Sequence, residues 1–260
     1  MIQLLGVALA TAMITGQAQE QVDPQPKPPI PAKASEAEKA IKWTFNADFY
    51  SRYVWRGAPL NTKAVFQPSI TAEGQGWGAT IWGNVDLTDE NLYYGADGQG
   101  RITEWDSTAW YSKATESGTW TLGVTHYDFP NTGFASTTEL WGQWAFGGEW
   151  NPYIAAFFDV DEVDGTYVRF GAGKSQATGQ GTLSYGAYAA WSTKKMNNFL
   201  YGNNEAGLSD FGINLTYAFP FAGGEWKFYG NYSTLLNADH RRGQSDRSNF
   251  AFGAGWGFKF

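Results

Sequence analysis

The last twelve residues of the chain, 249–260, read NFAFGAGWGFKF and alternate between aromatic or apolar side chains and small or polar ones. Successive side chains of a β-strand point to opposite faces, so this alternation predicts a strand with two unlike faces. One face carries Phe250, Phe252, Ala254, Trp256, Phe258 and Phe260. The other face carries small or polar residues, with glycine at 253, 255 and 257, which suits a crowded or hydrated interior.

The same two-faced pattern recurs along most of the chain. It predicts twelve strands, near residues 43–56, 65–73, 77–87, 104–114, 119–129, 137–147, 153–161, 167–175, 182–192, 208–219, 226–234 and 249–260. Tight connections such as 74–76 alternate with longer polar ones such as 88–103. This alternation is typical of an all-β, antiparallel up-and-down barrel that spans an outer membrane. Merging 153–161 with 167–175 into one irregular hairpin would instead give a ten-stranded barrel.

The composition excludes several classes of protein. The chain contains 32 glycine, 13 tryptophan, 14 tyrosine and 18 phenylalanine residues, with only 17% charged residues and no cysteine. The glycines follow no three-residue period, which excludes collagen, and the abundant aromatic residues exclude disorder over most of the length. Without cysteine there are no disulfides, thiolate metal sites or cysteine nucleophiles. A net charge of −7 without a basic stripe argues against a nucleic-acid partner.

The amino-terminal part is predicted to lie outside the barrel. Residues 1–18 are predicted to be a signal peptide, because the apolar run 4–14 is shorter than the ~20 residues of a spanning helix and small residues precede the expected cleavage after Ala18. A membrane anchor is the alternative for this segment. Residues 19–41 hold half of the ten prolines and predict an extended periplasmic linker, or a docking segment for a periplasmic partner. The barrel is expected to occupy 42–260.

The choice between a membrane barrel and a soluble sandwich or lipocalin-like barrel depends on which strand face is dry. Large aromatic residues near strand ends predict interfacial girdles at Trp43, Trp55, Trp77, Trp105, Trp120, Trp191 and Trp226. The opposite face is rich in Gly, Ser, Thr, Asn and mixed charges, which suits a lumen better than an outer surface in water. The terminal Phe260 resembles the signal by which the barrel assembly machinery recognises outer-membrane proteins. These features favour a barrel in contact with outer-membrane lipid and lipopolysaccharide.

One sequence segment carries a family resemblance. Residues 51–57, Ser-Arg-Tyr-Val-Trp-Arg-Gly, followed by Gln-Pro-Ser-Ile at 67–70, resemble the first two strands of bacterial outer-membrane proteins of the TorF or Gcw_chp type. Residues 78–86 and Thr-His-Tyr-Asp-Phe-Pro at 125–130 are also similar to segments of that family. The family carries an acidic residue where this chain has Arg52. The resemblance implies the barrel fold and the outer-membrane location rather than a particular activity.

The inward face is where function is expected, because lumen residues tune selectivity while the outer face meets lipid. The charged residues predicted to line a lumen or constriction are Asp48, Arg52, Arg56, Asp86, Asp106, Glu139, Asp159, Arg169 and Asp210. Facing rows of Arg and acids would set a transverse field across a narrow water path. Alternatively, they form a closed salt-bridge network that fills the lumen and stiffens the barrel. The inward aromatic residues are interpreted as packing, with stacking on a sugar or an aromatic solute as the alternative; they are Trp82, Trp110, Trp141, Tyr188 and Tyr229.

Neither catalysis nor a metal or other cofactor is predicted. His126, with Asp128 two residues further along the same face, is interpreted as a girdle residue rather than as part of a Ser-His pair on the outer wall. His240 lies in a basic loop that is expected to meet lipopolysaccharide phosphates or solvent rather than a metal. The acidic stretch 159–164 lacks the spacing of an EF-hand and is interpreted as a solvated rim.

The sequence therefore predicts an outer-membrane barrel that is not an enzyme. Its expected function is that of a porin-like, narrow channel for the passive diffusion of small hydrophilic solutes. The alternative is a non-conducting structural barrel, or one whose linker or outer loops bind a partner.

Overall fold

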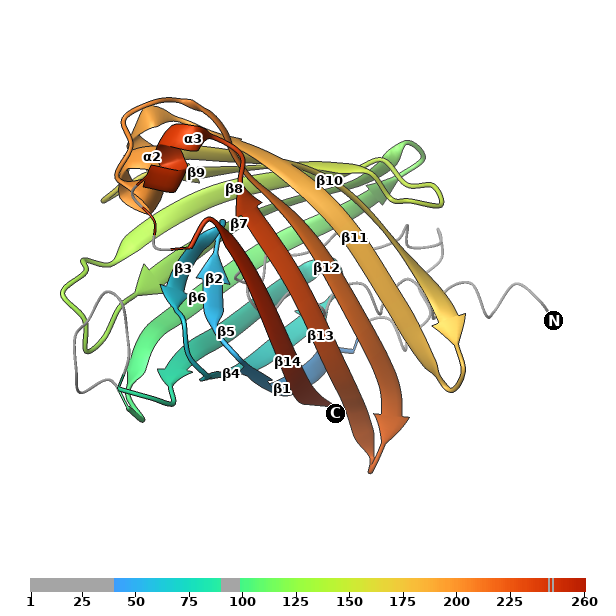
Figure 1. Cartoon of the computed structure of the whole chain (residues 1–260). Coiled ribbons are helices and arrows are strands. Elements are labelled where there is room, and N and C mark those ends of the chain that lie inside the picture. Colours follow the sequence, from blue (N-terminus) through green and yellow to red (C-terminus); the bar gives the residue numbers. More distant parts are fainter. Residues whose placement is uncertain (1–39, 90–98, 243, 245) are drawn as a thin grey trace.

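The computed structural model describes residues 40–89, 99–242, 244 and 246–260. The barrel strands are β1 (Lys42–Tyr50), β4 (Val65–Gly74), β5 (Trp77–Asp86), β6 (Ile102–Thr115), β7 (Gly118–Asp128), β8 (Thr137–Ala145), β9 (Tyr153–Asp159), β10 (Thr166–Thr178), β11 (Gly181–Ser192), β12 (Gly207–Phe221), β13 (Gly224–Leu235) and β14 (Ser248–Lys259). They pair antiparallel in sequence order, and β1 pairs with both β4 and β14, which closes the barrel (Figure 1).

The twelve predicted segments all form strands of the barrel wall, and the ten-stranded alternative is wrong. Strands β9 and β10 are separate neighbours in register, with Thr166 opposite Phe158. The first predicted strand is too long, because β1 ends at Tyr50 rather than at Arg56. Residues beyond it form a separate two-stranded sheet of β2 (Tyr53–Trp55) and β3 (Ala58–Asn61).

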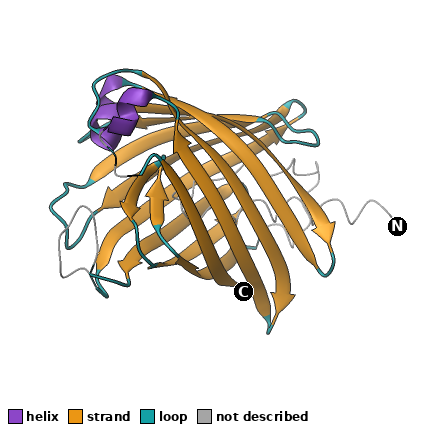
Figure 2. Ribbon diagram, in the orientation of Figure 1, coloured by secondary structure: helices purple, strands orange, loops and turns teal. Residues whose placement is uncertain are grey.

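The two ends of the barrel differ. Strand β1 begins and β14 ends at one rim, which we call the terminal rim; short turns such as 75–76 and 222–223 also lie there. The opposite rim, here the loop rim, carries the longer connections and the helices α2 (Lys194–Tyr201) and α3 (Ala238–Arg242), as Figure 2 shows. Among the described residues, no helix is long and apolar enough to cross a membrane.

The wall presents apolar side chains outward and polar ones inward. Leu122 and Phe252, in the middle of β7 and β14, are 58% and 59% exposed. By contrast, the inward Asp86 and Lys227 are 0% and 1% exposed. A water-soluble barrel would place its apolar face inside. The observed arrangement is the reverse, so the outer surface is a broad apolar belt of the kind that avoids water.

Glycine and aromatic residues alternate around the inner wall as cross-strand pairs. An aromatic ring on one strand covers the bare backbone of a glycine directly opposite on the next strand. The pairs are Gly78 with Trp110, Gly123 with Trp141, Gly171 with Tyr153, Gly212 with Tyr188, and Gly253 with Tyr50. A Cβ atom placed on these glycines would lie 2.1–2.6 Å from the nearest atom of the facing ring. The high glycine content therefore makes room for inward aromatic rings.

Glycines also allow side chains of β13 and β1 to meet across β14. The inward positions of β14 include Gly253, Gly255 and Gly257. Strands two positions apart are separated by about 9–10 Å, yet Lys227 Nζ donates a hydrogen bond to Asn46 Oδ1 at 2.8 Å. Tyr229 likewise donates its hydroxyl to Asp48 Oδ1 at 2.8 Å. These bonds fasten the closure between the first and last strands.

The glycine–aromatic pairing predicts a steric effect at Gly123. In a Gly123→Ala variant the new methyl group would meet Trp141 Cζ2 at 2.1 Å, whereas a methyl group at Gly133 meets nothing within 4 Å. Overpacking of this kind costs about 1–3 kcal/mol. We expect the urea midpoint of the folded barrel in detergent micelles to fall for Gly123→Ala and to stay unchanged for Gly133→Ala. Equal midpoints for the two variants would contradict the packing described here.

Candidate functional site

Residues 51–64 leave the barrel wall and fold into the lumen, and we call this segment the luminal hairpin. Tyr50 of β1 is still paired with Val65 of β4, so the segment is an excursion between two adjacent wall strands. At its tip, Arg56 and Gly57 have φ angles of 49° and 76°. Two successive positive φ angles correspond to a type I′ turn, the usual two-residue connection of a β-hairpin.

Aromatic side chains of the luminal hairpin pack against the inner wall. The ring of Tyr53 lies 5.8 Å from Trp82 of β5, and the ring of Trp55 lies 6.0 Å from Tyr127 of β7. Both hairpin residues are buried. The predicted girdle position of Trp55 is therefore wrong. Its apolar alternation continues from β1 through the hairpin, but the chain has already turned inward, so the ring fills the lumen instead of facing outward.

Arg56 forms a buried ion pair with Glu139 of β8. Its Nη1 and Nη2 donate to Glu139 Oε1 and Oε2 at 2.7 and 2.8 Å, a bidentate geometry, and both side chains are at most 2% exposed. Tyr127 donates a further hydrogen bond to Glu139 Oε2 at 2.7 Å. The guanidinium lies 4.5 Å from the ring centroids of both Trp55 and Tyr167. Stacking and pairing both offset the cost of removing this charge from water.

Two backbone carbonyls at the tip of the luminal hairpin accept hydrogen bonds from side chains of α2 and β14. Tyr201 of α2 donates its hydroxyl to the carbonyl oxygen of Arg56 at 2.5 Å, and Asn249 Nδ2 of β14 donates to that of Gly57 at 3.2 Å. A Cβ atom at Gly57 would lie 2.8 Å from Cβ of Asp210 on β12. The tip is therefore anchored on several sides, and its glycine is required both by the turn and by this close approach.

The base of the luminal hairpin is tied to β14. Arg52 Nη1 donates to Asn249 Oδ1 at 2.8 Å and to Asp246 Oδ2 at 3.2 Å. Arg52 and Arg56 fall within the first predicted strand, 43–56, and this placement is wrong, since both lie beyond the end of β1 at Tyr50. The acids that pair with them, Asp246 and Glu139, were not identified as partners from the sequence.

The remaining predicted lumen residues point inward and are buried. They are Asp48 at the closure and Asp86, Asp106, Asp159, Arg169 and Asp210 in the half of the barrel nearest the loop rim. Asp210, for example, accepts the hydroxyl of Tyr167 at 3.1 Å. The hypothesis of charged rows facing open water does not describe this half of the lumen. The closed network of the second hypothesis does, because the charges are enclosed by hydrogen bonds and aromatic rings.

Asp159 organises the connection between β9 and β10. Its Oδ1 accepts the backbone N–H groups of Asp161, Val163 and Asp164 at 2.9–3.1 Å, and its Oδ2 accepts the hydroxyl of Thr137 at 2.7 Å. Both carboxylate oxygens of Asp159 thus accept hydrogen bonds from the protein, and the side chain is buried rather than solvated. Within the described parts of the chain, no group of three His, Asp or Glu is arranged to hold a metal ion.

Helices α2 and α3 cover part of the loop rim above the luminal hairpin. Met196, Leu200 and Tyr201 of α2 are buried, and the ring of His240 in α3 stacks on Tyr201 at 4.8 Å. The expectation that His240 meets lipopolysaccharide or solvent is wrong, because its side chain is fully buried. Burial lowers the pKa of His240, which keeps the ring neutral at pH 7. Arg242 of the same cluster remains 81% exposed.

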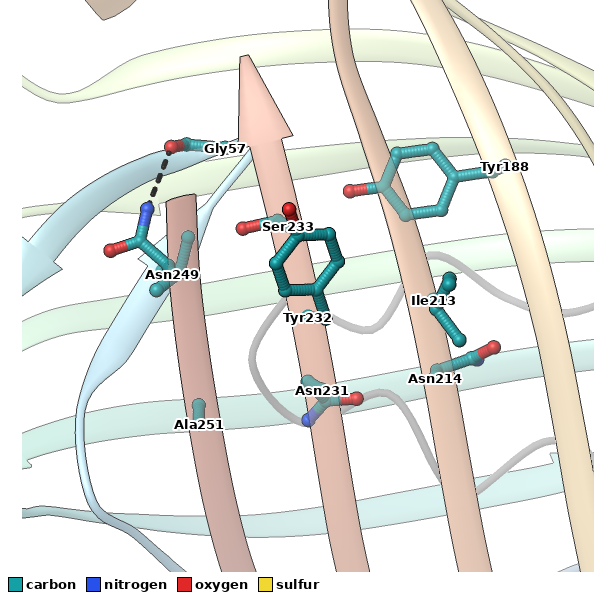
Figure 3. A pocket seen from close by; sticks show the side chains of 10 residues that line it. Gly57, Tyr188, Ile213, Asn214, Asn231, Tyr232, Ser233, Asn249 and Ala251 are labelled. Atoms are coloured by element: carbon teal, nitrogen blue, oxygen red, sulfur yellow. Dashed lines mark hydrogen bonds between the residues drawn. The ribbon is translucent and has the colours of Figure 1, made fainter. Parts of the chain in front are cut away.

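On its other side the luminal hairpin leaves a half-open pocket against the wall (Figure 3). Its empty space, including the open mouth, is about 420 Å³. The lining residues are Val54 and Gly57 of the hairpin segment and Tyr188, Ile213, Asn214, Asn231, Tyr232, Ser233, Asn249 and Ala251 of β11–β14. Of these residues, only Tyr188 was assigned a role from the sequence, as packing or, alternatively, as a residue that stacks on a solute. The hairpin thus packs its aromatic rings and Arg56 against β5–β10, contacts β12 and β14 at its tip, and leaves a pocket beside β11–β14.

Six of the predicted girdle residues lie on the outer face. Trp43, Trp77, Trp120 and Trp226 lie toward the terminal rim, and Trp105 and Trp191 toward the loop rim. Phe260 follows the last strand and is 63% exposed, with backbone hydrogen bonds of 3.0 Å to Trp43 in both directions. The outer surface therefore has aromatic side chains near both ends of the wall.

His126 also lies on the outer face. Its Nδ1 is 3.0 Å from the hydroxyl oxygen of Thr138 on β8, and its Nε2 is 3.6 Å from Asp128. Ser107 is directly opposite on β6, but the two ring nitrogens are directed at Thr138 and Asp128. His126 is therefore a polar residue among the aromatic residues of the outer face, with its ring nitrogens near Thr138 and Asp128.

Comparisons with known proteins support the fold. No family model and no curated protein matches the sequence. Among solved structures, the chain is similar to the NanC porin in its rhombohedral crystal form, with a TM-score of 0.51 and 12% identity over 84% of this chain and 100% of that one. It also matches the KdgM porin in complex with disordered oligogalacturonate (TM-score 0.49, 8% identity, 84% and 99% covered). The chain therefore has a porin-like, twelve-stranded barrel fold.

The buried ion pair predicts a specific stability effect. Glu139→Gln leaves the guanidinium of Arg56 buried without its anion, which costs about 3–5 kcal/mol. We expect a lower urea midpoint for Glu139→Gln in micelles and no change for Glu116→Gln on an exposed turn. Adding Arg56→Met to Glu139→Gln should recover part of the loss, because no unpaired charge then remains. A double variant that is less stable than Glu139→Gln would contradict the view that the loss comes from the unpaired charge of Arg56.

Proposed function

We propose that this chain is an exported protein of the bacterial outer membrane and forms a narrow channel for the passive diffusion of small hydrophilic solutes. The exposed apolar belt with aromatic residues near both rims supports contact with lipid, since such a surface is unfavourable in water. The porin-like fold supports the same role. A passive channel needs no catalytic group, and the lumen offers polar walls instead.

The single observation that carries the proposal is the asymmetric position of the luminal hairpin. Its tip is pinned against β8 by the pair of Arg56 and Glu139, while the half-open pocket lies on its β11–β14 side. A diffusion path along that side would be narrow and would pass uncharged groups. Because the charges of the other side are buried, we expect weak selectivity between cations and anions.

Targeting and assembly are part of the same proposal. The segments 1–18 and 19–41, expected to be a signal peptide and a Pro-rich linker, lie outside the described residues apart from the last two positions of the linker. We propose that the first directs export, that the terminal strand with Phe260 is read by the barrel assembly machinery, and that the linker reaches a periplasmic partner. Lipopolysaccharide would contact the outer face near the loop rim.

A non-conducting barrel is the second candidate, and one observation favours it. Arg56 and Glu139 are both buried, and α2 and α3 lie over the same rim, so the half of the lumen nearest that rim is well filled. In that case the luminal hairpin is a permanent plug that stiffens the wall.

Replacing the luminal hairpin separates the two candidates. Because Tyr50 and Val65 are paired, residues 51–64 can be replaced by a two-residue Asn-Gly turn without breaking the wall. In planar bilayers we expect small conductance steps from the wild type and several-fold larger steps from the shortened variant. A silent wild type with a conducting shortened variant would support the plugged barrel. Silence of both, with folding shown by a heat-dependent gel shift, would contradict the channel.

A further inference from the structure

The pocket beside the luminal hairpin presents polar groups without any charge. Its polar lining comes from neighbouring strands in register: Asn214 of β12 lies opposite Asn231 of β13, and Ser233 of β13 lies opposite Asn249 of β14. Figure 3 shows the amides of Asn214 and Asn231 side by side on adjacent strands. Among the residues that the structure describes, no acidic or basic one contributes to the lining. The pocket therefore offers a row of neutral hydrogen-bonding groups.

One of these groups lacks a partner. Asn249 is engaged at both ends, because its Nδ2 donates to Gly57 O and its Oδ1 accepts Arg52. Asn231 Nδ2 is buried, yet it has no hydrogen-bond partner among the described residues. A buried N–H donor without an acceptor is costly, so such a group is normally satisfied by water or by a ligand. An oxygen atom of a molecule in the pocket would satisfy it.

The rest of the lining suits a molecule with both polar and apolar edges. Val54, Ala251 and the side chain of Tyr188 supply apolar surface between the amides. Polyhydroxy compounds such as monosaccharides combine hydroxyl groups, which both donate and accept, with patches of C–H. Pockets that bind small molecules typically pair a mainly apolar wall with a few placed polar groups. The empty space of about 420 Å³ includes open solvent at the mouth, so the enclosed part is smaller and suits only a small solute.

The charged residues near the pocket are buried or already bound. Arg56 is bound to Glu139 on the far side of the hairpin, and Arg52 is bound to Asp246 and Asn249. Asp210, next to Gly57, is 0% exposed and accepts the hydroxyls of Tyr167 and Ser209. Arg169, whose guanidinium lies 4.6 Å from the ring centroid of Tyr188, is 1% exposed. A charged solute would leave water without gaining an ionic partner, which is unfavourable. An uncharged solute loses less, because neutral amides can replace its hydrogen bonds to water.

We propose that this pocket binds small uncharged polyhydroxy solutes of monosaccharide size or smaller, with Asn231 as a donor. The role of this binding in transport rests on the proposed channel function, whereas the binding itself does not. The pocket then selects for neutral hydroxylated solutes over charged ones where a path would pass the luminal hairpin.

Binding is tested without reference to conduction. Saturation-transfer difference NMR on the full chain, refolded in detergent, would compare methyl α-glucoside with gluconate. In Asn231→Ala we expect the dissociation constant of the glucoside to be about two- to tenfold larger than in the wild type. This is the effect of losing one hydrogen bond. The nearly isosteric Asn231→Leu, which lacks the N–H donors and adds no charge, should behave likewise. Asn198→Ala, on the exposed side of α2, should match the wild type.

Several outcomes would overturn the proposal. Equal signals for glucoside and gluconate, or unchanged glucoside binding in both folded Asn231 variants, would contradict a neutral-solute pocket. Liposome swelling distinguishes this failure from failure of the channel. Swelling that is equally fast with glucoside and gluconate leaves the channel intact but removes the selectivity. Glucoside binding by NMR without any swelling keeps the pocket and contradicts the channel.

Discussion

A closed barrel of twelve strands encloses more space than a small barrel, and that space must be filled by side chains or left to water. Barrels of about eight strands can be packed by their own inward residues, whereas those of 16–18 strands hold an aqueous channel. This chain lies between these limits. It uses two fillers: aromatic rings that cover glycines of the adjacent strand, and the luminal hairpin, whose tip is fixed by the pair of Arg56 and Glu139.

The luminal hairpin and the inward rings give the two sides of the lumen different surroundings. On the β5–β10 side, charges and aromatic rings contact one another and are removed from water, as around Glu139 and Tyr127. On the β11–β14 side, the hairpin is held by Asn249 and packs Gly57 against the buried Asp210, and the half-open pocket remains beside these contacts. A single excursion of the chain therefore produces both the rigid half and the half-open half of the barrel. The proposed channel and the proposed solute pocket both depend on this asymmetry.

Period-two alternation predicted the wall well, because each strand faces two different environments and the pattern records both. It failed at residues 51–64, where Tyr53 and Trp55 continue the alternation although the chain has left the wall. The turn signal was present in Arg56-Gly57, followed by Pro59, but a hairpin inside a lumen has the same alternation as a wall strand. Inward charged positions were predicted from parity alone. Their partners were not, because the contact of Arg56 with Glu139 spans 83 residues.

The central claim is that the luminal hairpin lies inside the barrel, and cysteine accessibility tests it most directly. The chain has no native cysteine, so a single Ala58→Cys substitution introduces a unique thiol at a position that is 1% exposed. Our account predicts that a bulky maleimide labels this thiol only after the barrel is unfolded, while Ala135→Cys on an exposed loop is labelled in the folded state. Labelling of both thiols at similar rates in the folded barrel would contradict it.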